Sequence, residues 1–293
     1  EKLERLTPKA EETAFWYHHQ YNNGFFFTSN YNREFLALYY YDLEKRTYKL
    51  VREFNWDIQI LAIGSRYMLY TVNVDSVSKL YLRDLRTGSE KEIKLPEGVI
   101  WGMQSFGEKD KFAFSFTCYK HPGEIYILDV EKELKPHKIS EMAYGRIPEE
   151  YFVKPEIIRY KSFDGKEISA LLHKPKVKGK RPVIVYLHGG PEGQSRPSYR
   201  EFICYMVHRG IAVVEPNFRG SSGYGRSFQR LIRKDWGGGE LKDVEYLVKF
   251  LLQQDWVDAS RLCVMGGSFG GFLTLSCVSR LPDYWRCGVD VFG

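Results

Sequence analysis

The sequence contains few cysteines, and their arrangement predicts neither a metal site nor a disulfide framework. Five cysteines occur among 293 residues, with no C-x-x-C pair and no zinc-type spacing to histidine. We therefore expect free, mostly buried thiols in a reducing compartment. A disulfide between Cys277 and Cys287 is the alternative that the sequence leaves undecided. Cofactor motifs are also lacking, because the glycine-rich stretches 216–225 and 237–239 do not match a phosphate-binding loop. We predict no metal and no cofactor.

Long apolar runs are absent as well. No stretch of eighteen apolar residues occurs, which excludes a membrane-spanning helix of the usual kind. The chain begins Glu-Lys-Leu-Glu-Arg, without Met and without the apolar core of a secretion signal. We expect a cytoplasmic protein whose true start lies upstream. Aromatic residues make up 16% of the chain, too much apolar surface for a disordered protein.

The charge balance is mildly positive, with 43 Lys and Arg against 37 Asp and Glu. The excess lies after residue 150, and much of it is the run Lys174, Lys176, Lys178, Lys180 and Arg181. We interpret this run as a solvated loop, because no nucleic-acid recognition motif flanks it. We expect no nucleic-acid partner and no membrane partner.

Residues 1–150 have the pattern of an all-β domain. Short aromatic and β-branched runs alternate with polar turns, and three of these runs end in Asp followed by Leu or Val and a charged turn. The three aspartates, Asp42, Asp84 and Asp129, are 42 and 45 residues apart, which is typical of β-propeller blades of about four strands. An irregular β-sandwich is the alternative. Three blades do not close a ring, so we predict a partial β-propeller.

Residues 151–293 have a different pattern, which follows a linker at 141–155. A hairpin at 157–173 precedes strands that alternate with helices. We expect strands at 183–187, 211–215, 262–265 and 287–292, and helices at 199–209, 240–254 and 272–281. This alternation predicts a mainly parallel sheet with helices on both faces.

The third of these strands leads into G-x-S-x-G, formed by Gly266, Ser268 and Gly270. In this strand–turn–helix setting the motif predicts a nucleophile elbow, in which a strained turn exposes Ser268 at the end of the strand. The two glycines leave room for the close backbone approach that the turn requires. The N–H of Phe269, at the start of the following helix, is the natural donor to a developing oxyanion.

A second motif, H-G-G-P, follows the strand at 183–187. In hydrolases with an elbow of this kind, such a loop supplies the other oxyanion amide. We expect the N–H of Gly190 as that donor, with Gly189 as the alternative. His188 precedes the serine and lies in this loop, so we expect a structural, hydrogen-bonded histidine rather than the general base.

These motifs resemble those of the prolyl oligopeptidase family of serine peptidases, particularly its acylaminoacyl-peptidase-like branch. The matching strings lie at 188–191, 216–225, 235–244 and 266–271, in the order and spacing of the family. The resemblance implies an α/β-hydrolase domain with a propeller over its active site. It also implies cleavage of short peptides through a Ser-Asp-His triad and an acyl-enzyme, with Ser268 as nucleophile and the amides of Phe269 and Gly190 as the oxyanion hole.

The sequence departs from the family in its acid and its base. All seven histidines precede Ser268, and only Asp283 and Asp290 follow it, too closely for the family's acid. We therefore expect a hydrolase domain that is incomplete after the elbow, with the triad Asp and His in a further C-terminal segment or chain.

Several alternatives remain open from the sequence. The chain could be a carboxylesterase or thioesterase, or a non-catalytic propeller–hydrolase binding protein. The sequence leaves exopeptidase or endopeptidase action and a homo-oligomeric state undecided. Glu11-Glu12 and Glu149-Glu150 are candidate pairs for holding a free N-terminus. Tyr224, Phe228 and Trp236 are candidates for lining the site.

Overall fold

The computed structural model describes residues 3–8, 13–107, 109–142, 147–148 and 151–293. The chain divides into two compact units. The first contains residues 1–117, 123–142 and 223–226, and the second contains residues 118–122, 143–222 and 227–293. The sequence-based division at residue 150 differs from these units in two ways. The main boundary lies between residues 142 and 143, and two short segments, 118–122 and 223–226, belong to the unit on the other side of it. The expected linker at 141–155 lies partly outside the described residues.

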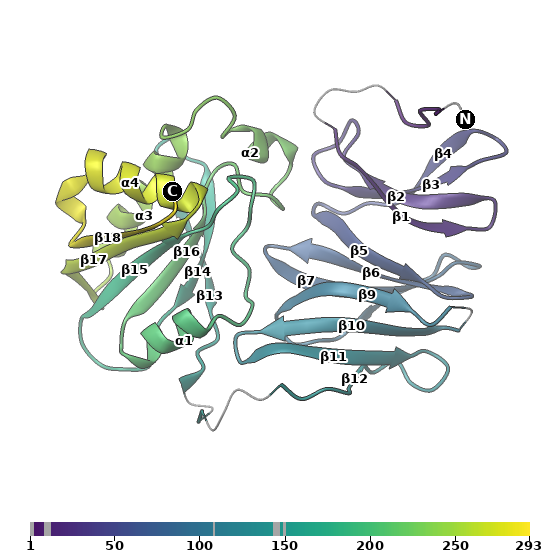
Figure 1. Cartoon of the computed structure of the whole chain (residues 1–293), viewed down its shortest axis with the longest axis horizontal. Coiled ribbons are helices and arrows are strands. Elements are labelled where there is room, and N and C mark those ends of the chain that lie inside the picture. The colour runs from purple at the N-terminus through teal and green to yellow at the C-terminus, as the bar shows by residue number, and fades with distance from the viewer. Residues whose placement is uncertain (1–2, 9–12, 108, 143–146, 149–150) are drawn as a thin grey trace. The chain divides into compact units, whose positions relative to one another are not determined.

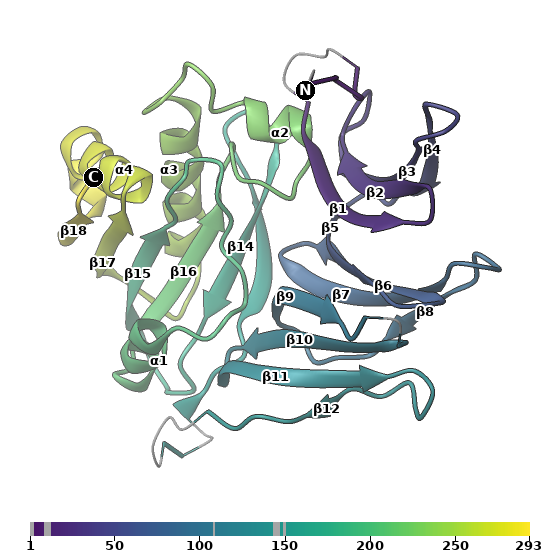
Figure 2. The ribbon, with the colours of Figure 1, turned by 45° about the vertical axis from the view of Figure 1, so that its right-hand side comes forward.

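The first unit contains three four-stranded antiparallel sheets, each built from consecutive strands (Figure 2). The first sheet is β1 (Phe15–Tyr21), β2 (Gly24–Ser29), β3 (Ala37–Asp42) and β4 (Thr47–Arg52). The second is β5 (Asp57–Ile63), β6 (Tyr67–Val74), β7 (Val77–Asp84) and β8 (Glu90–Ile93). The third is β9 (Val99–Ser105), β10 (Lys111–Cys118), β11 (His121–Asp129) and β12 (His137–Lys138). The three sheets begin at residues 15, 57 and 99, a constant spacing of 42 residues.

The aspartates of the sequence repeat end the third strand of each sheet. Asp42 and Asp84 use one carboxylate oxygen to accept the backbone N–H groups of the turn that follows. The N–H groups of Glu44 and Lys45 donate to Asp42, and those of Arg86 and Thr87 donate to Asp84. Aspartate recurs at this position because its short side chain satisfies turn amides that have no ladder partner.

Neighbouring sheets contact one another through their first strands, β1 with β5 and β5 with β9. Asp110 adds a polar link, because its carboxylate accepts hydrogen bonds from the hydroxyl of Ser65 and from the N–H groups of Arg66 and Tyr67. This acceptor is buried at 7% exposure, and it joins the loop after β9 to the turn before β6. Successive four-stranded sheets that meet through their first strands are the arrangement expected of propeller blades.

The second unit is built on a six-stranded sheet in the order β13-β14-β16-β15-β17-β18. Its strands are β13 (Glu156–Lys161), β14 (Glu167–His173), β15 (Arg181–Leu187), β16 (Ala212–Asn217), β17 (Val257–Gly267) and β18 (Cys287–Val291). β13 and β14 form the predicted antiparallel hairpin. β16 pairs antiparallel with β14 and parallel with β15, and β15, β17 and β18 are all parallel. The predicted mainly parallel sheet is confirmed.

Helices cover both faces of this sheet, as the sequence predicts (Figure 1). α3 (Gly239–Leu252) and α4 (Phe269–Arg280) pack on the face that carries Val183, Val185 and Leu187 of β15. α1 (Glu201–His208) packs on the face that carries Ile184 and Tyr186. Alternate residues of β15 thus face opposite layers, because side chains alternate across a strand. A short helix, α2 (Arg226–Arg230), lies in the connection between β16 and α3. None of the helices in the described part of the chain is long and apolar enough to cross a membrane.

The expectation that all five thiols are free is wrong. Cys263 and Cys287 are joined by a disulfide, while Cys118, Cys204 and Cys277 are free. The two bonded residues are register partners on the neighbouring parallel strands β17 and β18, with Cα atoms 4.9 Å apart. Cys277, the partner considered from the sequence, is buried on α4. Spacing along the chain does not reveal such a pairing, because strand register depends on the whole sheet.

The core under α3 allows a matched stability test. Leu247 has no exposed surface, whereas Leu252, in the same helix, is 40% exposed. We predict that Leu247→Ala lowers the free energy of unfolding by about 2–5 kcal/mol, because it leaves a cavity in the core. Leu252→Ala should cost about 1 kcal/mol or less. Urea unfolding of the full-length protein, followed at the transition of the second unit, measures both. Equal losses in the two variants would contradict the packing described here.

Candidate functional site

Two loops meet at one edge of the six-stranded sheet because their strands are parallel neighbours. β15 pairs with β17 along its length, and the last pair joins Leu187 to Gly266. The chain leaves β15 at His188 and leaves β17 at Ser268, so both loops emerge at the carboxyl ends of the strands. Ligands of open α/β sheets bind at this edge. The H-G-G and G-x-S-x-G motifs are therefore adjacent in space.

The turn at Ser268 is tight and strained. Ser268 has φ +53°, a left-handed conformation that is uncommon for a residue other than glycine, and the residue is exposed. A Cβ atom added to Gly266 would lie 2.3 Å from the carbonyl oxygen of Gly270, and one added to Gly270 would lie 2.1 Å from that of Leu187. Only glycine fits at these two positions. α4 begins at the next residue, Phe269, so a helix N-terminus lies directly behind the serine.

Backbone amides suited to an anion lie beside Ser268. Phe269 is the first residue of α4, and its N–H therefore has no carbonyl partner within the helix. On the facing loop, a Cβ atom added to Gly189 would lie 3.4 Å from the Cβ of Ser268 and 4.0 Å from its Oγ. Gly190 has φ +131°, and a Cβ there would collide with the amide nitrogens of Glu192 and Gly193. Both Gly189 and Gly190 remain candidates for the second donor.

His188 is a buried residue with a partner at each ring nitrogen. Nδ1 lies 2.9 Å from the carbonyl oxygen of Gly189, and Nε2 lies 2.8 Å from Oγ of Ser221. A carbonyl only accepts, so Nδ1 carries the proton in its contact with Gly189. The single hydroxyl proton of Ser221 is shared between Nε2 and the carbonyl oxygen of Phe218, which lies 2.6 Å from Oγ. The ring stacks on Phe218 at 4.3 Å, and burial lowers the pKa of His188 to about 4. A neutral histidine engaged at both nitrogens is suited to holding the loop rather than to deprotonating Ser268.

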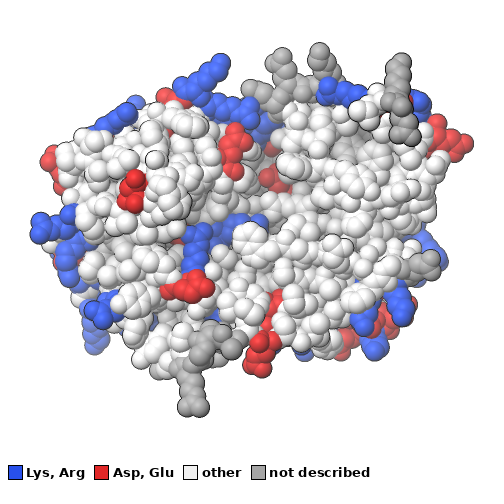
Figure 3. Space-filling model, viewed as in Figure 1, with Lys and Arg blue, Asp and Glu red and all other residues white. Residues whose placement is uncertain are grey.

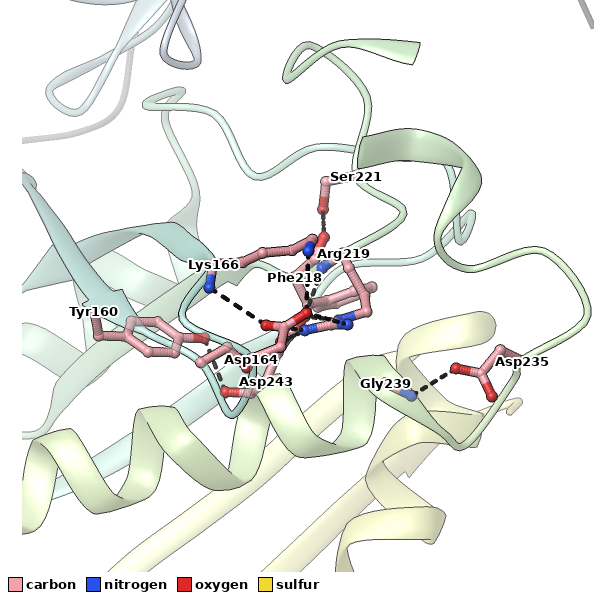
Figure 4. Close-up of polar contacts among 10 residues, drawn as sticks. Tyr160, Asp164, Lys166, Phe218, Arg219, Ser221, Asp235, Gly239 and Asp243 are labelled. Carbon is pink, nitrogen blue, oxygen red and sulfur yellow. Dashed lines mark hydrogen bonds and ion pairs between the residues drawn. The ribbon is translucent and has the colours of Figure 1, made fainter. Parts of the chain in front are cut away.

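The loop that carries Ser221 is fixed by a buried ion pair (Figure 4). The guanidinium of Arg219 donates from Nε and one terminal nitrogen to the two carboxylate oxygens of Asp243, at 2.9 and 2.8 Å. The backbone N–H of Arg219 also donates to Asp243, at 2.8 Å, and the hydroxyl of Ser162 donates to the same carboxylate. Asp243, in α3, is completely buried. Its charge is compensated by Arg219 and several hydrogen bonds, as a buried carboxylate requires.

Asp164 adds a second carboxylate on the outer side of Arg219, at 3.2 and 3.3 Å from its terminal nitrogens. Burial alone would raise the pKa of Asp164, but hydrogen bonds from Arg219 and Lys166 hold it at about 2. Arg219 also presents its charge to the face of the Phe163 ring, at 4.3 Å. No pattern in the sequence indicates this cluster. Arg219 and Asp243 lie within the motif strings, but their pairing is visible only in the fold.

A pocket of about 830 Å³ adjoins the loop that begins at His188. It is lined by Gly190, Pro191, Glu192, Ile232, Arg233, Lys234 and Trp236. The indole of Trp236 is 60% exposed and meets the ring of Phe269 edge-on, with centroids 5.2 Å apart. Trp236 therefore connects the pocket to the residue that follows Ser268.

The other aromatic candidates lie elsewhere. Tyr224 belongs to the first unit, where its hydroxyl donates to Asp75 at 2.9 Å. Phe228 is partly buried and packs against the core of the second unit. Glu11-Glu12 and Glu149-Glu150 lie outside the described residues. Within the described part of the chain, no group of three or more His, Cys, Asp or Glu is arranged to hold a metal ion.

The hydroxyl of Ser268 has no hydrogen-bonding side chain among the described residues. Asp290 instead accepts the N–H of Gly293 at 2.9 Å, and Asp283 lies in a short 3₁₀ turn, η2 (Pro282–Tyr284), after α4. The described residues thus supply the serine turn and the candidate amides, but no base in contact with the serine.

Residues 197–293 match the model of the prolyl oligopeptidase family. The chain is 32% identical over 186 residues to the peptidase YuxL of Bacillus subtilis (strain 168), covering 62% of this chain and 28% of that protein. It is 31% identical over 134 residues to the acylamino-acid-releasing enzyme of Homo sapiens, covering 46% of this chain and 18% of that enzyme. The resemblance to the family and to its acylaminoacyl-peptidase branch is confirmed.

The fold has close counterparts among solved structures. A prolyl endopeptidase structure superposes with a TM-score of 0.87 at 20% identity, covering 97% of this chain and 43% of that one. At this identity the likeness establishes the fold alone, in which successive four-stranded antiparallel sheets precede a mixed sheet flanked by helices. The chain spans less than a third of these two curated relatives and less than half of the solved structure.

The burial of His188 predicts a pH-dependent loss of stability. Unfolded His188 binds a proton near its ordinary pKa of 6.5, whereas folded His188 binds one only near pH 4. The free energy of unfolding is therefore nearly independent of this group well above pH 6.5, and it decreases as the pH falls from 6.5 toward 4. Between pH 7 and pH 5 this group should remove about 2 kcal/mol from the free energy of unfolding.

His188→Gln removes the titrating group, so its stability deficit relative to wild type should shrink by that amount over the same pH range. Urea unfolding at the two pH values measures it. A deficit that stays constant would contradict the buried, neutral state of His188.

Proposed function

We propose that the protein is a serine peptidase that cleaves short peptides through an acyl-enzyme on Ser268. The observation that carries this proposal is the strained, exposed turn at Ser268, in which Gly266 and Gly270 approach too closely for any side chain. Strain of this kind in a non-glycine residue persists where the surrounding structure holds it, and it is typical of active sites. The peptidase relatives support the choice of reaction.

In the proposed reaction, Oγ of Ser268 attacks the carbonyl carbon of the scissile bond. The negative charge that develops on the carbonyl oxygen is stabilised by the N–H of Phe269 and by the N–H of Gly190, with Gly189 as the alternative. A general base takes the hydroxyl proton of Ser268 and gives it to the amine as the C–N bond breaks, which leaves an ester on Ser268. Water then hydrolyses this ester and restores the hydroxyl. Amides held by the elbow and by the loop after β15 would stabilise this charge without reorganising.

The base and its orienting acid are proposed to come from outside this chain. Every histidine of the chain precedes Ser268, and the family order places the acid and then the histidine after the nucleophile. An unassisted serine hydroxyl is a poor nucleophile, because it must lose its proton as it attacks. We propose that the full-length protein, or a complementing chain, supplies both residues.

The three sheets of the first unit are proposed to be three blades of a larger propeller that limits the size of the peptides admitted. The acylaminoacyl and prolyl peptidase relatives support this assignment. The cytoplasmic location remains a prediction from the sequence, and a homo-oligomeric state remains undecided.

Covalent labelling tests the nucleophile. In the full-length protein, a fluorophosphonate should label one serine, and peptide mapping should identify it as Ser268. Ser268→Ala should abolish labelling and lower kcat for an N-acyl peptide by on the order of 10⁴-fold or more. Labelling that persists in Ser268→Ala, or that maps to another serine, would refute the proposal.

Neighbouring glycines test the elbow itself. A Cβ at Gly266 would lie 2.3 Å from a backbone oxygen, whereas a Cβ at Gly267 would meet atoms of Val291 at 3.6 and 3.8 Å, which is ordinary contact. We predict that Gly266→Ala slows fluorophosphonate labelling by about tenfold or more. A rise of about 1.4 kcal/mol in the activation free energy, caused by a displaced Ser268, is enough for that change. Gly267→Ala is the matched control and should label at nearly the wild-type rate. Equal rates for the two variants would contradict the geometry.

A further inference from the structure

The pocket beside Gly190 is lined by two cations, Arg233 and Lys234, and they differ in their partners among the residues that the structure describes. Arg233 forms an ion pair with Glu192 at 3.3 Å, and the side chain of Gln229 donates to the same carboxylate at 2.5 Å. The carboxylate of Asp235 accepts the N–H of Gly239 at the start of α3. The nearest acids along the loops are therefore engaged. Lys234 forms no ion pair with any Asp or Glu of the described residues, although it lines the pocket.

The backbone at Lys234 is also unusual. Its φ is +61°, the left-handed region that a lysine seldom adopts. A non-glycine residue is strained in this conformation, and such strain often marks a functional position. Figure 3 shows Lys and Arg side chains gathered over the part of the surface where α2 lies. Among the residues that line the pocket, Arg233 and Lys234 are cations and Glu192 is the single acid, so this side of the pocket carries a net positive charge.

Trp236 supplies the apolar part of the same pocket. Its indole is exposed, yet it rests edge-on against Phe269, so the ring has a fixed support and an open face. Lys234 and Trp236 are two residues apart along the loop and both line the pocket. The pocket thus combines one ammonium group with one aromatic wall, next to the loop that holds the candidate oxyanion donors.

We propose that this pocket binds the free C-terminal residue of a short peptide, with its α-carboxylate at Lys234 and its side chain on Trp236. A C-terminal residue carries a carboxylate and a side chain on the same carbon, which matches the two groups of the pocket. An aspartate or glutamate side chain would satisfy Lys234 but would leave Trp236 without an apolar partner. This inference rests on the proposed peptidase function and adds a preference for peptides that end at this pocket.

Binding of a product dipeptide tests the pocket without requiring turnover. Alanyl-phenylalanine with a free carboxylate and the same dipeptide as its C-terminal amide are titrated into the full-length protein by calorimetry. The free acid should bind roughly three- to fivefold more tightly, the range expected for one solvent-exposed ion pair. This preference should weaken as the salt concentration rises, because an exposed ion pair is screened.

Variants of Lys234 identify the group that recognises the carboxylate. Lys234→Asn removes the charge with a residue that tolerates left-handed backbone, and the acid and amide should then bind within about twofold of each other. Lys234→Arg should restore the preference. Lys178→Asn, an exposed lysine in the loop before β15, is the matched control and should leave the preference unchanged. Trp236→Ala should weaken both dipeptides together.

Two results would overturn the inference. One is equal binding of acid and amide by the wild-type protein, and the other is a preference that survives in Lys234→Asn. If Ser268 is labelled normally by the fluorophosphonate, either result rejects carboxylate binding in this pocket and leaves the peptidase proposal intact. Failure of labelling with the carboxylate preference retained would reject the peptidase proposal instead.

Discussion

The pairing of β15 with β17 is the constraint on which the rest of the site depends. The two strands are parallel and in contact, so the loops that follow them emerge together, although their residues lie far apart in the sequence. One loop offers glycine amides and the other a strained serine at a helix N-terminus. If this register slipped by one residue, every side chain of the strand would move to the opposite face and the two motifs would no longer meet. The core of β-branched and leucine side chains on β15 holds this register.

Behind these loops lies a buried polar framework. Asp243 binds both the side chain and the backbone of Arg219, and Ser221, two residues further along, contacts His188. Each buried polar group in this series has a partner, which is the condition for such a network to rigidify a site. The loop that carries the candidate oxyanion amides is thus connected to α3 on the other side of the sheet edge. In this arrangement His188 contributes to positioning, and the proton acceptor of the proposed reaction would be another group.

The sequence predicted the features that depend on local pattern. The strand–turn–helix around Ser268, the hairpin of β13 and β14 and the helical stripe of α3 each follow from neighbouring residues. Features that depend on contacts between distant segments were missed. β17 begins at Val257, earlier than predicted, because Val257 pairs with Arg181 of β15. The residues next to Val257 in the sequence lack the pattern of a strand, so this extension was not predicted. The Cys263–Cys287 disulfide and the Arg219–Asp243 pair arise in the same way from register and packing. The pocket at Lys234 and Trp236 could not be predicted either, because it depends on the backbone conformation of Lys234 and on the fold that brings this loop beside Gly190.

The central claim is that Ser268 and two backbone amides form one site for an acyl-transfer transition state. It is tested most directly by a crystal structure of the full-length protein with a phosphonate analogue of an N-acyl peptide. The account predicts a covalent bond from Oγ of Ser268 to phosphorus. It also predicts a phosphonyl oxygen within about 2.7–3.1 Å of the amide nitrogen of Phe269 and of that of Gly190 or Gly189. An adduct on another residue, or an oxygen directed away from these amides, would contradict it.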